Sequence, residues 1–134
     1  MKVKSNAKAL KRARAIGVEA ARLVALVRAC LPRSGSEKFF ALEEQSGMEW
    51  EEFEPLMCSS PVLVGAGPEW RDLAAAALAC DDVILAEHCA ALALLCEDLE
   101  RLVDSAGDET GDVLAREAAI AAAVGASGAA EEGP

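Results

Sequence analysis

Apolar residues in the first quarter of the chain recur at steps of three and four, which is the spacing of one helix face. This pattern predicts a long helix over residues 6–31, and Pro32 ends it because proline disfavours a helical residue before it. Basic side chains project from a separate side of the same helix. The apolar face consists of Ile16, Ala20, Leu23, Val24, Val27, Cys30 and Leu31.

Two short helices are expected next, over residues 37–46 and 48–57. Ser36 is a suitable N-cap for the first, and Gly47 is suited to end it in a left-handed conformation. The first carries Phe39 and Phe40, and the second carries Trp50 and Phe53, so we expect an aromatic helix pair. Proline and glycine then mark residues 58–68 as a linker.

The longest predicted helix covers residues 69–104, with Pro68 and Glu69 suited to its first turn. Leucines repeat every seven residues along it, and half-step positions add further apolar residues, which is typical of a seam between helices. We expect this seam to join copies of the chain into a homo-oligomer. An alternative is a break into two helices at Asp81 and Asp82. The seam residues are Leu78, Leu85, His88, Leu92, Leu95, Leu99 and Leu102.

A last alanine-rich helix is predicted over residues 112–124, and the composition of residues 125–134 is typical of a disordered tail. The hydrophobic share is 53%, but 29 residues are alanine, which favours helix and buries little area. Strand formers are scarce. The expected fold is therefore all-α, a single domain over residues 1–124 built as a four- to five-helix bundle.

The net charge of −10 is unevenly distributed. Residues 1–33 hold nine basic side chains and one acid, whereas residues 34–134 hold four basic side chains and 22 acids. The chain is therefore bipolar, with a charge of +8 in its first segment and −18 in the rest.

The basic helix face predicts contact with an anionic surface: nucleic acid, an acidic protein or lipid headgroups. The alternative is that the helix docks on the acidic remainder of its own chain. No aromatic residue is interleaved with the basic ones, so stacking of single-stranded bases has no support. The residues of the basic face are Lys4, Lys8, Lys11, Arg12, Arg14 and Arg22.

Acidic side chains gather around the aromatic pair, where they predict a surface for a partner protein with a basic surface. The outline of this region also fits a helix–turn–helix, but its second helix would repel DNA phosphates. The alternative is an aromatic core contact with a solvated glutamate face. The acidic and aromatic residues are Glu43, Glu44, Glu49, Trp50, Glu51, Glu52, Phe53 and Glu54.

The sequence contains few residues at the spacings that catalysis or metal binding requires. The five cysteines and His88 show no C-x-x-C or i,i+4 ligand spacing, so we expect no metal and no cofactor. Cys89 and His88 are neighbours on a helix and point about 100° apart, which places a catalytic dyad poorly. We expect no enzyme activity. Free thiols and no apolar span indicate a cytoplasmic protein, although the acid-free residues 1–18 leave organellar targeting open.

The spacing of Trp70, Asp82, Cys89, Asp98 and Leu102 resembles the central helical part of phage small terminase subunits. That resemblance implies a DNA-packaging protein that contacts phosphates through the basic N-terminal helix. The charge layout favours a different function, a non-catalytic helical protein-interaction module such as an adaptor, chaperone-like binder or inhibitor. The nucleic-acid-binding component is the alternative.

Overall fold

The computed structural model describes residues 2–33, 35–47 and 64–132, with side chains placed for residues 7–33, 35–47 and 64–124. The described ranges are all-helical. The helices are α1 (Lys2–Cys30), α2 (Glu37–Ser46), α4 (Gly67–Ala79), α5 (Val83–Ala106) and α6 (Asp108–Glu132). The predicted helix over residues 48–57 lies outside the described residues, and so does most of the predicted linker.

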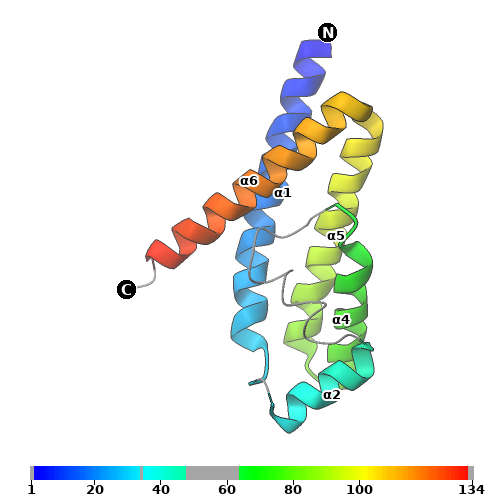
Figure 1. Cartoon of the computed structure of the whole chain (residues 1–134), viewed down its shortest axis with the longest axis vertical. Helices are drawn as coiled ribbons and strands as arrows, with labels where there is room; N and C mark the ends of the chain where they lie inside the picture. The colour runs from blue at the N-terminus through cyan, green and yellow to red at the C-terminus, as the bar shows by residue number, and fades with distance from the viewer. Residues whose placement is uncertain (1, 34, 48–63, 133–134) are drawn as a thin grey trace.

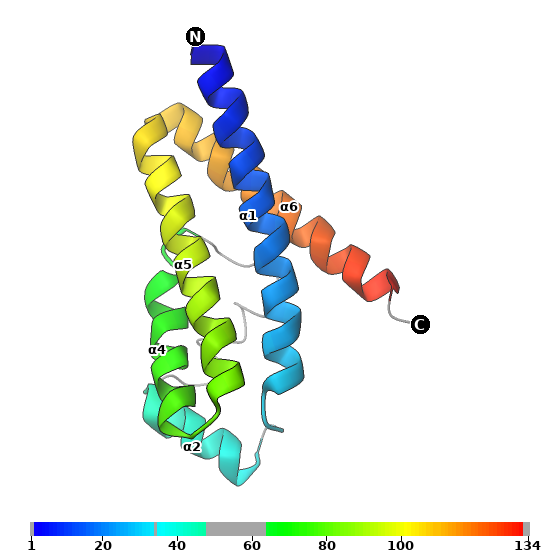
Figure 2. The same ribbon diagram turned by 180° about the vertical axis from the view of Figure 1, so that it is seen from behind.

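Helices α4, α5 and α1 form the body of the molecule. Figure 1 shows α4 descending and α5 ascending beside it, with α1 on the other side of α5. α2 lies across the lower end, against α4, and α6 crosses α1 obliquely. The first turns of α1 and the last turns of α6 extend beyond the bundle, as the reverse view in Figure 2 also shows.

The predicted apolar face of α1 is buried where it meets the bundle. Ile16, Ala20, Leu23 and Val27 are inaccessible or nearly so, because this face packs against α5 and α6. Further core residues come from every other described helix. They include Phe39, Leu42, Trp70, Leu73, Leu85, Cys89, Leu92, Cys96, Leu99, Leu114 and Ala118.

The caps predicted for α2 are confirmed. The Phe39 backbone N–H donates to Ser36 Oγ at 3.2 Å, which satisfies one of the unpaired donors in the first turn. Gly47 has φ 68°, and its N–H donates to the Glu43 carbonyl at 2.9 Å. A left-handed glycine is the usual helix end because it has no Cβ to clash.

The prediction of one helix over residues 69–104 is wrong. α4 ends at Ala79, Asp81 adopts a left-handed conformation with φ 63°, and α5 begins at Val83. The Asp82 carboxylate accepts the Leu85 N–H at 3.2 Å and caps α5. Aspartate tolerates the left-handed region and is a strong N-cap, so the two aspartates reverse the chain.

The C-terminal end also differs from the prediction. The backbone of α6 continues to Glu132, past residue 124, so the predicted disordered tail is not confirmed. Alanine is the best helix former, and it recurs at positions 126, 129 and 130. These alanines favour continuing the helix and oppose the cost of Gly125 and Gly128.

Candidate functional site

The basic face of α1 is partly used inside the molecule. Arg12 donates to Asp98 of α5 at 3.3 Å, and Arg14 donates to Glu117 of α6 at 2.6 and 3.0 Å. Arg22 pairs with Glu19 one turn away on α1 itself. Three of the six predicted anion contacts therefore already have carboxylate partners, two of them on other helices.

The lysines of this face are placed differently. Lys8 and Lys11 are exposed, and neither makes an ion pair within the described residues. The Lys4 side chain lies outside the described residues. The basic face thus divides into Arg12 and Arg14, which join α1 to other helices, and Lys8 and Lys11, which are exposed.

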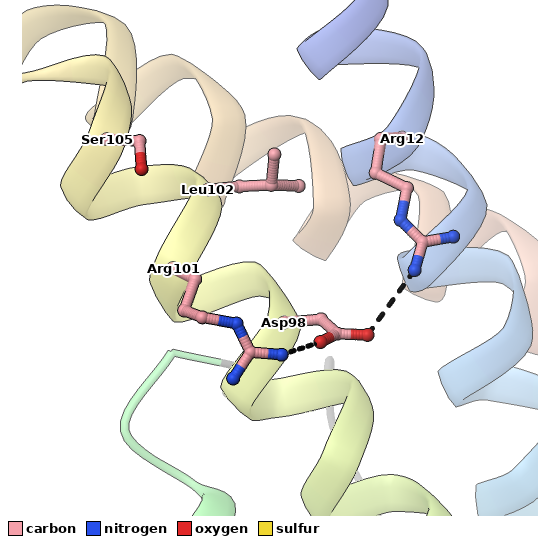
Figure 3. A pocket seen from close by; sticks show the side chains of 5 residues that line it. All are labelled: Arg12, Asp98, Arg101, Leu102 and Ser105. Carbon is pink, nitrogen blue, oxygen red and sulfur yellow. Dashed lines mark hydrogen bonds and ion pairs between the residues drawn. The ribbon is translucent and has the colours of Figure 1, made fainter.

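A shallow hollow of about 260 Å³ lies between α1 and α5, lined by Arg12, Asp98, Arg101, Leu102 and Ser105. Figure 3 shows the Asp98 carboxylate between the Arg12 and Arg101 guanidinium groups, with bonds to both. An incoming anion would have to compete with Asp98 for these arginines. The charged residues that line the hollow therefore form an ion-paired contact between α1 and α5, and they do not form a free anion-binding site.

A second hollow of about 300 Å³ lies at the corner between α5 and α6. Its lining includes three carboxylates, those of Asp104, Asp108 and Asp112, beside Val103 and Gly107. Within the described ranges, no group of three His, Cys, Asp or Glu side chains is arranged to hold a metal ion.

Ion pairing also joins α4 to α5. Arg71 donates to Glu97 at 2.7 Å, and this hydrogen bonding lowers the pKa of Glu97. The main consequence of these pairs is that Glu97 and Asp98 already have cationic partners.

The acidic and aromatic surface is described only on α2. Glu43 is half-buried and Glu44 is exposed, whereas residues 49–54 lie outside the described ranges. Phe39 and Leu42 anchor α2 in the core, but the neighbouring Phe40 is 58% exposed. Phe39 and Phe40 are neighbours in the sequence and both were expected in the aromatic helix pair. Only the orientation of α2 shows that Phe39 is a core residue and Phe40 a surface residue.

The predicted oligomer seam is divided between core and surface. Leu85, Leu92 and Leu99 are buried inside one chain, where a second copy cannot reach them without opening the fold. Leu78 belongs to α4 and is exposed, and His88, Leu95 and Leu102 are half-buried. Packing within the chain therefore explains Leu85, Leu92 and Leu99, which corrects the assignment of these three leucines to an interface.

Several prominent residues were missed by the sequence analysis. Val83, Ile84 and Leu94 of α5 are large, apolar and more than half exposed. The eleven-residue spacing of Val83 and Leu94 places these two on one side of a helix, but the stronger leucine repeat dominates the pattern. Gly17 was also missed, although it allows α1 and α6 to touch.

Four of the five cysteines are described, and Cys58 lies outside the described residues. Cys89 and Cys96 are fully buried, and Cys30 and Cys80 are half-buried. Burial raises the pKa of Cys89 and of Cys96 from 9.0 to about 12, because a thiolate is poorly solvated in the core. Both thiols are therefore neutral and unreactive in the folded protein.

This burial predicts an alkaline loss of stability. Above the unfolded-state pKa near 9.0, the unfolded chain releases thiol protons that the folded chain retains until about pH 12. The stabilisation is complete below pH 9 and declines as pH rises, by about 1 kcal/mol per thiol between pH 8.5 and 10. Urea unfolding across this range measures it. The double variant Cys89→Ala/Cys96→Ala should lose the slope, and an unchanged slope would contradict the assignment.

The residues behind the terminase resemblance have structural roles here. Trp70 and Cys89 fill the core, Asp82 caps α5, and Asp98 joins α5 to α1.

None of the helices in the described ranges is both long and apolar enough to cross a bilayer. No protein-family model, curated protein or solved structure matches the chain.

Proposed function

We propose that this chain is a non-catalytic helical interaction module that binds a partner protein with a basic surface. The observation that carries the proposal is the exposed Phe40 on α2. Its neighbour Phe39 is buried, so α2 is already anchored, and Phe40 is not needed for the core. Exposed aromatic side chains commonly serve as anchors in protein interfaces.

The charges around Phe40 support a basic partner. Glu37 and Glu44 lie three residues before and four residues after it, which places all three on one side of α2. Both glutamates are exposed. Residues 34–134 carry a net charge of −18, so the long-range field of this part of the chain also attracts a cationic surface.

Nucleic-acid binding through the basic face is the alternative. The observation in its favour is that Lys8 and Lys11 are exposed. Against it, phosphates would have to displace Asp98 from Arg12 and Glu117 from Arg14.

Two matched variants separate these functions in the full chain. Phe40→Ser/Glu44→Lys changes the α2 surface, and Lys8→Glu/Lys11→Glu changes the exposed lysines; neither pair includes a fully buried residue. We expect a captured partner protein to be lost with the α2 variant and retained with the lysine variant. Circular dichroism checks that both variants fold.

A salt series with duplex and single-stranded DNA completes the test. We expect weak binding to DNA with a shallow dependence on salt. Six phosphate contacts would instead give a log–log slope near −5. That slope in the wild type, together with its loss in Lys8→Glu/Lys11→Glu, would establish the nucleic-acid alternative and refute the proposed function.

A further inference from the structure

Helix α5 is apolar on two opposite sides. Leu85, Leu92 and Leu99 point into the core and are fully buried. On the other side, Val83 is 53% and Leu94 is 56% exposed, and Ile84, at one edge of this side, is 60% exposed. A soluble bundle helix normally presents polar residues to water, so this second apolar side is unusual.

The exposed residues follow one helical line. Val83, Glu87, Ala90 and Leu94 are separated by four, three and four residues, and all four are exposed. The line spans eleven residues and is about 16 Å long at the rise of an α-helix.

Free charges beside this line are acidic. Glu87 lies within it, and the exposed Asp81 lies just before its start. The one arginine of α5, Arg101, is paired with Asp98, and Arg71 of the adjacent α4 is paired with Glu97. A cationic group approaching the line therefore meets Glu87 and Asp81, whereas an anionic group meets no unpaired arginine on α4 or α5.

We propose that this outer face of α5 (Val83, Ile84, Glu87, Ala90 and Leu94) docks a basic amphipathic helix of a partner protein. Its apolar side chains would cover Val83, Ile84 and Leu94, and its lysines or arginines would pair with Glu87 and Asp81. The inference rests on the proposed function, because it specifies how a basic partner binds. The start of α5 lies at the same end of the bundle as α2 (Figure 1).

The probe is an 18-residue peptide of leucine and lysine arranged with helical periodicity. One control peptide has the same composition, with leucine and lysine in alternating order. The other control peptide keeps the helical order and has glutamate in place of lysine. With the isotope-labelled full chain, we expect the helical lysine peptide to shift the amide signals of Val83, Glu87 and Leu94. The double variant Ile84→Ser/Leu94→Ser should weaken binding at least about tenfold, as removal of an interface anchor does.

Matched variants test the location and the charge. Ile120→Ser changes a similarly exposed isoleucine on α6 and should leave binding unchanged. Glu87→Lys should weaken binding of the lysine peptide and strengthen that of the glutamate peptide. Thermal unfolding of each variant identifies any loss that comes from misfolding.

Four results would overturn the proposal. The first two are equal binding of the alternating peptide and no binding of the helical lysine peptide. The third is a loss of peptide binding in Ile120→Ser as large as in Ile84→Ser/Leu94→Ser. The fourth is that the chain forms a dimer that Leu94→Ser dissociates. The dimer would make a second copy the occupant. The proposed function fails separately: it requires that the captured partner be lost with Phe40→Ser/Glu44→Lys, whatever the α5 variants do.

Discussion

Replacing Gly17 with alanine is expected to lower the free energy of unfolding by about 3 kcal/mol, although alanine is the better helix former. A Cβ at position 17 would lie 2.2 Å from the Ala118 carbonyl oxygen and 3.0 Å from the Ala121 Cβ. The first of these atoms belongs to the backbone of α6 and cannot rotate away. α1 and α6 must therefore separate, and part of the packing between these two helices is lost.

Gly67→Ala is the matched control. Position 67 lies in the first turn of α4, and its new Cβ would meet Glu97 Cγ at 3.5 Å, an ordinary contact with a flexible side chain. This variant should lose no more than about 1 kcal/mol, because the restriction of the unfolded chain by alanine offsets the cost of a helical Cβ directly before Pro68. Urea unfolding followed by circular dichroism measures both variants. A Gly17→Ala protein as stable as the wild type would show that α1 and α6 do not cross in contact at this residue.

Local signals predicted the parts of the fold that depend on local chemistry. The buried stripe of α1 and the Ser36 and Gly47 caps of α2 follow from residue spacing and backbone conformation within a few residues. The break at Asp81 and Asp82 was only an alternative, because the leucine repeat continues across it. A periodic pattern depends only on the positions of residues along the chain, so it can continue across a point where the chain reverses direction.

Features that depend on two distant segments were not predictable in this way. Arg14 appears in the sequence as a free cation, and its pairing with Glu117 requires α6 to cross α1 beside it. Gly17 is likewise an ordinary helix-interior glycine until Ala118 is placed against it. The candidate surfaces changed for the same reason, since only the packed structure shows that Leu92 is inside and Leu94 is outside.

Trp70→Ala is the second substitution with a large expected effect, a loss of about 3–5 kcal/mol in the free energy of unfolding. Trp70 is the largest fully buried side chain among the described residues, and it lies in the first turns of α4, where that helix packs on α5. Removing the indole leaves a cavity that Leu73 and Ala77, held by their own helix, cannot fill.

The indole nitrogen makes a comparison with phenylalanine informative. Among the described residues no acceptor is found for the buried Trp70 Nε1–H, and an unpaired buried donor opposes folding by about 1–3 kcal/mol. Trp70→Phe keeps most of the apolar volume and removes that donor, so it should lose only about 1 kcal/mol. Denaturant unfolding followed by circular dichroism compares the two variants. If Trp70→Phe were as unstable as Trp70→Ala, the nitrogen would have a hydrogen-bond partner, and the tryptophan would be retained for that bond as well as for its volume.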